Sequence, residues 1–312
     1  MDNGRVTQSA IASMLVGRDL ILDFLRIATR AGDPLDTVLM MAVINANVAP
    51  VSARPDLQLT YGGEDGVPPD WIRRPLPISG LARSLSLPFE TVRRRISRLC
   101  AAGVCEMTSA GVVVPKRVLD TPEFTQAGYD NLVILRTAHG RLSALGLLPP
   151  AVEATGSSVT KEADGLRIAA RLATDYFLRM VDALGQEVGD LIDGIILLQL
   201  SRENTRSLGD RAPLGAFAAD EHKRPATAAA VARELNLAPE TVRRRIKRLV
   251  LEGRCSPIDG GYIIPQEHVA SRFVELRAAN EQNLLRLFRL LESFGISRGW
   301  AAAQPGRPDR RA

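Results

Sequence analysis

Apolar residues recur at helical spacing along most of the chain. Stretches with this period cover residues 7–30, 34–49, 121–147, 166–184, 188–204 and 266–295. Each stretch predicts a helix with one buried face. Between them lie two regions that combine short helical stripes with short β-prone runs. The pattern predicts a mainly α-helical protein that carries small β-hairpins.

One segment of the chain occurs twice. Residues 90–99 read ETVRRRISRL and residues 240–249 read ETVRRRIKRL, so nine of ten positions are identical at an offset of 150. The same offset holds without a gap from Arg74 to Pro115 and from Arg224 to Pro265. Further upstream, residues 36–47 resemble residues 193–204 at an offset of 157. The difference falls in loops, where changes of length cost little.

This repeat predicts two homologous helical domains, each with the same internal order of elements. We place the first at residues 1–150 and the second at residues 160–300. The segment near 149–165 is rich in Pro, Gly, Ser and Thr, which is typical of a linker. Residues 301–312 have the composition of a disordered basic tail.

Each copy contains the pattern of a helix-turn-helix. In the first copy a short helix begins near Ile78 or Ser79, and residues 86–88 interrupt it. The next helix carries Val92, Ile96 and Leu99 on one face, at the spacing of a buried stripe. The second copy has Val242, Ile246 and Leu249 at the matching positions.

A hairpin pattern follows each of these helices. In the first copy, β-prone residues 104–108 and 112–115 flank a glycine turn; in the second, residues 254–258 and 262–265 flank Asp259 and two glycines. A helix-turn-helix followed directly by a hairpin is a winged helix. The sequence therefore predicts winged helices at about residues 70–117 and 220–267.

The two segments also resemble a known class of protein. LARSLSLPFETVRRRISRLCAAGVCE and VARELNLAPETVRRRIKRLVLEGRC are similar to the DNA-reading units of bacterial regulators of the MarR, GntR and IclR type. The resemblance covers residues 70–117 and 220–267. It implies a winged-helix fold and, at lower specificity, a role in transcriptional regulation. The helices outside these segments match no family pattern.

The second helix of each motif is the predicted recognition helix. Its apolar stripe is used for packing, so its arginines face outward to varying degrees, and guanidinium groups pair with guanine edges or phosphates. Thr91 and Arg93 are the base-reading candidates, because N-terminal residues of such helices enter the major groove. Arg95 and Arg245 are expected to flank the core contact and reach the DNA backbone. The predicted DNA-binding residues are Thr91, Arg93, Arg94, Arg95, Arg98, Thr241, Arg243, Arg244, Arg245, Lys247 and Arg248, with Lys116, Arg117 and Arg254 as wing contacts.

Other interpretations of the arginine run stay open. Runs of this kind on helices are usually a solvated face, although the recurrence at one motif position in both halves argues against that here. Winged helices in some proteins bind protein instead of DNA, because a fold does not fix a function. A protein of plasmid or chromosome replication or partition is a further DNA-binding alternative.

Composition adds limits to this picture. Hydrophobic residues make up 46% and charged residues 24%, as in a folded protein, and the net charge of +5 gains meaning only from where the arginines lie. The most apolar stretch, residues 191–200, contains Asp193 and is half as long as the ~20 residues of a membrane span. We therefore expect no membrane contact and a cytoplasmic, nucleoid-associated protein.

Nothing in the sequence predicts catalysis, a metal or a cofactor. Three cysteines form no Cys-x-x-Cys pair, and the three histidines lack ligand spacing. Cys105 and Cys255 are equivalent and are interpreted as core hydrophobes. Asn47 and Asn204 recur at helix ends and are interpreted as C-terminal caps. No phosphate-binding glycine loop or nucleophile elbow occurs, so we expect a protein that is not an enzyme.

These patterns together predict a sequence-specific, DNA-binding transcriptional regulator with double-stranded DNA as its partner. The two units would act as a pseudo-dimer on half-sites about one helical turn (~34 Å) apart. The remaining helices have three open uses: joining the halves, forming a homodimer, or enclosing a small effector. Aromatic residues are only 4%, which gives an effector pocket no support, and the effector is unidentified.

Overall fold

The computed structural model of the chain describes residues 8–29, 32–148, 159, 161–208, 214, 219–298 and 300. These residues form a mainly helical protein with two small sheets, each of two antiparallel strands. The mainly helical fold with short hairpins is confirmed. Most of the predicted linker and the whole predicted basic tail lie outside the described residues.

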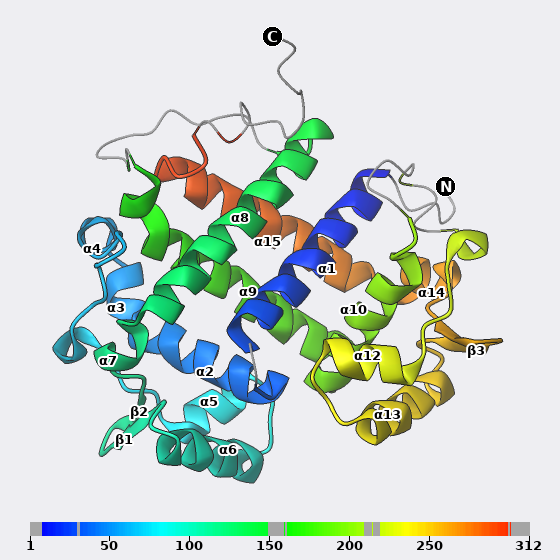
Figure 1. Cartoon of the computed structure of the whole chain (residues 1–312), viewed down its shortest axis with the longest axis horizontal. Coiled ribbons are helices and arrows are strands. Elements are labelled where there is room, and N and C mark those ends of the chain that lie inside the picture. Colours follow the sequence, from blue (N-terminus) through cyan, green and yellow to red (C-terminus); the bar gives the residue numbers. More distant parts are fainter. Residues whose placement is uncertain are drawn as a thin grey trace, which may run out of the picture.

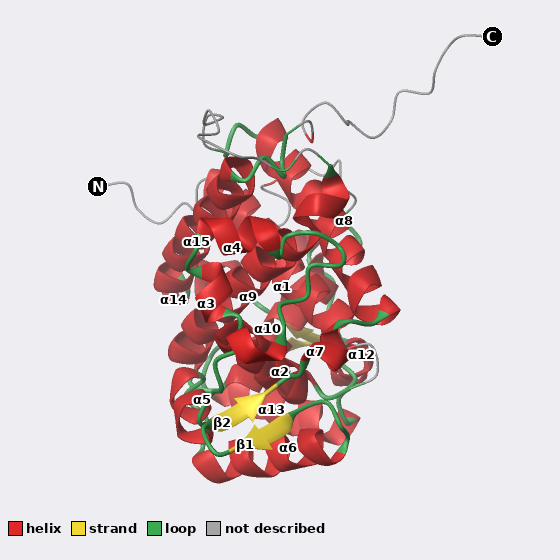
Figure 2. Ribbon diagram, turned by 90° about the vertical axis from the view of Figure 1, so that its left-hand side faces the viewer, coloured by secondary structure: helices red, strands yellow, loops and turns green. Residues whose placement is uncertain are grey.

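Four long helices make the body of the protein (Figures 1 and 2). They are α1 (Gln8–Thr29), α8 (Pro122–Ala144), α9 (Leu166–Val188) and α15 (Val274–Ser293). Helix α1 packs against α8 of its own half, and α9 packs against α15 of its own half. The first long helix of each half also contacts the other half: α1 contacts α15, and α9 contacts α8.

Two shorter helices connect this body to the repeated motifs. They are α2 (Pro34–Asn47) and α10 (Leu191–Thr205). Each begins at an aspartate N-cap: the Asp33 carboxylate accepts a hydrogen bond from the Leu35 amide at 2.8 Å, and Asp190 accepts one from Ile192 at 2.9 Å. Each also contacts the first long helix of the other half: α2 contacts α9, and α10 contacts α1.

The contacts of one half reappear in the other with the partners exchanged. The offset of 157 relates α1 to α9. Ala12 and Leu15 of α1 are buried, and they correspond to Ala169 and Leu172 of α9, which are also buried. A set of contacts that is unchanged when two copies are exchanged is the signature of an isologous, twofold arrangement. The buried apolar residues of both halves belong to one continuous core.

The repeated motifs lie together at one end of this body (Figures 1 and 2). The first consists of α5 (Ile78–Ser84), α6 (Phe89–Ala101), β1 (Glu106–Thr108) and β2 (Gly111–Val113). The second consists of α12 (Ala228–Glu234), α13 (Pro239–Leu251), β3 (Ser256–Ile258) and β4 (Gly261–Ile263). We call these sets of elements the first head and the second head. The predicted helices and hairpins of both copies are present at these positions.

Each hairpin is extended by a backbone pairing with the segment before the first helix of its head. In the first head, Leu76 and Val112 exchange backbone hydrogen bonds of 3.0 and 2.9 Å; in the second, Ala226 and Tyr262 do so. Gly111 makes this approach feasible, because a Cβ there would lie 2.5 Å from the Leu76 carbonyl carbon and the residue has φ +139°. The recurrence of this glycine in both copies therefore has a steric cause.

The remaining elements are short. They are α3 (Ala49–Ser52), α4 (Pro55–Thr60), α7 (Lys116–Leu119), α14 (Gln266–Arg272) and the 3₁₀ turns at Asp70–Ile72, Glu162–Gly165 and Asp220–His222. The single helix predicted over 266–295 is wrong: the chain leaves helical geometry at Phe273, whose side chain is buried. None of the described helices combines the length and the apolar character that a membrane crossing requires.

Candidate nucleic-acid interface

Helices α6 and α13 have the construction that the sequence predicts for recognition helices. Val92 and Ile96 on α6, and Val242 and Ile246 on α13, are fully buried against their heads. Burying side chains of this size contributes about 1.5–3 kcal/mol each. An acidic residue stands in the first turn of each helix, where it complements the helix dipole. The opposite face of each helix carries the arginines and is exposed.

The outward arginines differ in their surroundings. Arg93 donates from Nε to Glu90 at 3.0 Å, and Arg243 donates to Glu240 at 2.7 Å. The hydrogen bond from Arg243 lowers the pKa of Glu240, so this carboxylate stays charged. Arg94 and Arg244 are exposed and have no hydrogen bond or ion pair within the part of the chain that the structure describes. Their guanidinium groups therefore retain all their donors for a ligand.

Two arginines of α6, half-buried Arg95 and exposed Arg98, are held by carboxylates at the start of α2. Arg95 donates from Nη1 to Asp36 at 2.7 Å and lies 2.9 Å from Asp33, and Arg98 also pairs with Asp36. Although burial opposes its charge, the hydrogen bonds to Asp36 and Asp33 raise the pKa of Arg95. These two arginines therefore join the head to the helix beneath it.

The second head repeats this arrangement on α10. Arg245 donates to Asp193 at 2.6 Å and to Asp190 at 2.8 Å, and Arg248 also pairs with Asp193. Asp193 is 2% exposed, so its buried carboxylate depends on these two arginines for its hydrogen bonds. The prediction that Arg95, Arg98, Arg245 and Arg248 bind phosphate remains untested, but each has a structural partner that sequence analysis missed. The repeat points to these partners, because Asp36 and Asp193 occupy equivalent positions in the two copies.

The other predicted recognition residues lie along the same helices. Thr91 and Thr241 are half-buried in the first turns, with their positions matched between the heads. Lys247 is exposed and occupies the position of exposed Ser97 in the first copy. This substitution is the one difference in the matched ten-residue segments, so the second head carries one more positive charge there.

Each of the three predicted wing residues has a partner within the protein. Lys116 begins α7 and lies 3.4 Å from Asp120, and Arg117 pairs with Glu106 at the base of the first hairpin. Arg254 donates to the Glu187 carbonyl at 2.8 Å, and its side chain is only 18% exposed. Arg254 thus ties the second hairpin to the end of α9, and it is the least available of the three for a ligand.

Both heads use a buried asparagine to hold the hairpin. Asn47 donates from Nδ2 to the Arg74 and Val112 carbonyls and accepts at Oδ1 from the Val114 amide, at 2.8, 3.2 and 2.8 Å. Asn204 makes the corresponding three bonds in the second head. The prediction of a structural role is confirmed, but a C-terminal cap is wrong: the C-cap of α2 is Val48, and the amide reaches the strand instead.

The equivalent cysteines lie beneath the hairpins. Cys105 and Cys255 are buried and free of disulfides. Burial raises the pKa of both thiols to about 12, so the reactive thiolate is scarce at neutral pH. The described residues contain no group of three or more His, Cys, Asp or Glu side chains placed to hold a metal ion.

We expect neither buried thiol to react with a maleimide in the folded protein at about pH 8. Both should react once the chain is unfolded in urea. Peptide mass mapping after labelling measures this at each position. Fast labelling of native Cys105 or Cys255 would show that the hairpins open readily.

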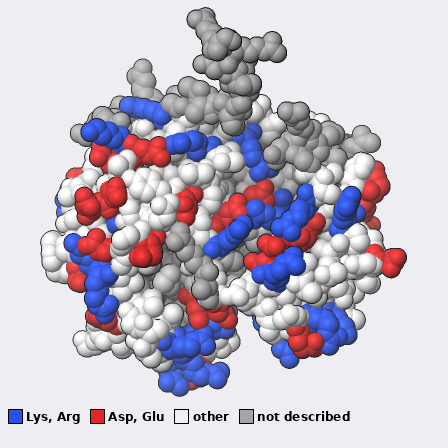
Figure 3. Space-filling model, in the orientation of Figure 1, with Lys and Arg blue, Asp and Glu red and all other residues white. Residues whose placement is uncertain are grey.

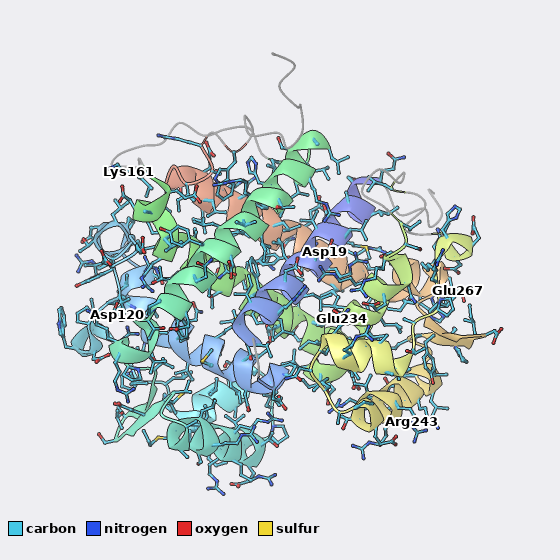
Figure 4. The ribbon with its side chains drawn as sticks, viewed as in Figure 1. Asp19, Asp120, Lys161, Glu234, Arg243 and Glu267 are labelled. Carbon is cyan, nitrogen blue, oxygen red and sulfur yellow. The ribbon has the colours of Figure 1, made fainter. Side chains whose placement is uncertain are left out.

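Basic side chains gather at the tips of both heads. Figure 3 shows Lys and Arg groups at the lower ends of the two lobes, where α6 and α13 lie in Figure 1. Figure 4 labels Arg243 on α13 at this end. The exposed arginines of the two heads are therefore presented on one end of the protein, although they lie 150 positions apart in the chain.

Comparison with known proteins gives no match, either to a family model, to a curated protein or to a solved structure.

Proposed function

We propose that the protein is a sequence-specific DNA-binding transcriptional regulator, in which one chain acts as a pseudo-dimer of two winged helices. The observation that carries this proposal is the placement of two nearly identical arginine faces at one end of a twofold-like body. DNA offers a matching partner, because its phosphates attract clustered arginines and its grooves admit helices.

The crosswise packing supports inverted half-sites. Two heads related by a twofold rotation read DNA in opposite directions, as the halves of a dimeric repressor do. Thr91 of the first head matches Thr241 of the second, and Arg93 matches Arg243, so both heads carry the same residues at these positions. We therefore propose a near-palindromic site whose two half-sites have closely similar sequences.

Gel-shift titration with genomic DNA fragments tests DNA binding directly. We expect retardation at low salt and a steep loss of affinity as salt rises, with a slope of about −0.9 per neutralised phosphate. Failure to retard any fragment at low salt, or a salt slope near zero, would contradict the proposal and favour a protein-binding role. Genome-wide occupancy of the tagged protein then separates promoters from a replication or partition locus.

A further inference from the structure

A large cavity opens between the two halves of the protein. Its walls come from α1 and α8 on one side and from α10 and α12 on the other, and its volume is about 1830 Å³. Sites for small molecules usually measure about 300–1,000 Å³, so this space is large enough for a ligand. Figure 4 labels one residue on each side, Asp19 on α1 and Glu234 on α12.

Guanidinium groups dominate the polar part of this cavity. Among the described residues, the lining has two carboxylates and six arginines, which are Arg18, Arg26, Arg136, Arg141, Arg202 and Arg206. Several of them have carboxylate partners nearby, such as Asp23 for Arg202 at 2.7 Å. With all these partners counted the wall keeps a small net positive charge, because Arg26 has no carboxylate partner among the described residues.

Three of these arginines surround one carboxylate. Arg18 is 9% exposed; its Nη1 donates to Thr205 at 2.9 Å, and its Nη2 lies 2.9 Å from Asp19. Arg141 donates to the other oxygen of Asp19 at 2.9 Å. Although burial opposes it, the charges of Arg18, Arg141 and Arg202 lower the pKa of Asp19. Asp19 and Asp23 together supply two negative charges against the three positive charges of these arginines.

Two cations of the wall keep donors for a ligand. Arg26 is exposed on α1 and has no carboxylate partner among the residues that the structure describes. Arg141 uses one nitrogen for Asp19, while a guanidinium offers five N–H donors, and its side chain is 42% exposed. An acidic group that entered the cavity would find these donors in place.

The charged wall does not follow from the duplication. At the offset of 157, Arg18 corresponds to Asp175, Asp19 to Tyr176 and Arg26 to Ala183. The matching face of α9 instead presents the Asp175 carboxylate, which pairs with Arg179 of α9 and Arg286 of α15. Arg18 and Arg26 of the cavity wall therefore have no arginine counterparts in the second copy.

Apolar side chains form another part of the wall. Leu15, Leu22 and Leu25 of α1 line it, and Trp300 lies at the same cavity with the Arg136 guanidinium 5.8 Å from its ring centre. Leu235 and Asn236 of the second head also contribute, and Asn236 donates to the Gly32 carbonyl of the first half at 3.0 Å. A bound molecule would thus touch both halves.

We propose that this cavity binds a small amphipathic anion, with its acidic head at Arg26 and Arg141 and its apolar body against the leucines of α1. A charge-assisted pair with guanidinium holds the head, while the apolar wall removes the body from water. The inference does not depend on the proposed function, because neither the site nor its test involves DNA.

A pair of fluorescent probes tests the proposal on the full chain. Anilinonaphthalene sulfonate has an aromatic body and an acidic head, and N-phenylnaphthylamine has the same body without the charge. The chain contains two tryptophans, so in a Trp71→Phe variant all indole emission comes from Trp300. We expect saturable binding of one sulfonate probe with energy transfer from Trp300, and binding of the neutral probe that is at least about tenfold weaker.

Charge-matched variants locate the head group. Arg26→Gln with Arg141→Gln should weaken the sulfonate probe about tenfold and leave the neutral probe unchanged. The control, Arg286→Gln with Arg289→Gln on α15, removes the same charge away from the cavity and should bind like the parent chain. If the double variant fails to fold, Arg26→Gln alone should still weaken the sulfonate probe. Equal binding of the two probes, absence of energy transfer, or equal losses in variant and control would overturn the proposal.

Discussion

Replacing Asn204 with alanine is expected to destabilise the second head by about 2–4 kcal/mol. The substitution leaves the Ile264 amide and the Arg224 carbonyl without the partners they have in the structure. Each unsatisfied buried group costs about 1–3 kcal/mol. The third bond is less costly to lose, because the Tyr262 carbonyl also accepts from the Ala226 amide. Urea unfolding followed by circular dichroism measures the change in free energy.

Asn47→Ala should give a loss of similar size in the first head, since Asn47 makes the same set of bonds. Asn283→Ala is the matched control, because its amide donates to the Ala279 carbonyl of its own helix and is only part-buried. That change should cost less than about 1 kcal/mol. If Asn47→Ala and Asn204→Ala cost no more than the control, the asparagines would not hold the hairpins to α2 and α10.

The elements of the heads were predictable because local patterns determine them. The stripe at Val92 and Ile96 fixes which face of α6 is buried, and the glycine at position 111 marks the turn of the hairpin. The repeat then transfers each element to the second copy. Such units can be predicted from a sequence because local propensity and the apolar pattern agree.

The arrangement of the long helices was not predictable in the same way. The apolar stripes of α1 and α9 show that one face of each is buried, but a stripe does not say which helix covers it. The crosswise contacts of α1 with α15 and of α9 with α8 join segments that lie far apart in the chain. The short helices α3 and α4 were missed because four to six residues are too few to show a helical period.

The roles of individual charges depended on the same long-range packing. Sequence position predicts that Arg95 and Arg98 lie near the surface, and the structure adds carboxylate partners from α2. The cavity was hidden for a similar reason: its arginines come from α1, α8 and α10, and none of these helices alone has an unusual charge. Low aromatic content gives a pocket no support, but guanidinium groups and leucines line this one.

Removing the unpaired arginines from both heads should have the largest effect on DNA binding. In Arg94→Ala with Arg244→Ala, two exposed guanidinium groups are lost that have no carboxylate partner among the described residues. A charge-assisted contact is worth about 1.5–3 kcal/mol, so two lost contacts correspond to a loss of about a hundredfold or more in affinity. The slope of log K against log salt should become less steep by about 2, because two phosphate contacts disappear.

This variant should weaken DNA binding without changing the stability of the fold. Arg94 and Arg244 make no intramolecular ion pair in the described residues, so their loss should leave the unfolding midpoint unchanged. Arg245→Ala, in contrast, would remove one of the two arginines that pair with the buried carboxylate of Asp193. Arg286→Ala with Arg289→Ala removes equal charge from α15, which belongs to neither head, and controls for net charge. Loss of affinity in the head variant alone would place DNA at the tips of α6 and α13. An unchanged salt slope and affinity in that variant would mean that these faces do not meet DNA, and a protein partner would then be the better explanation of the heads.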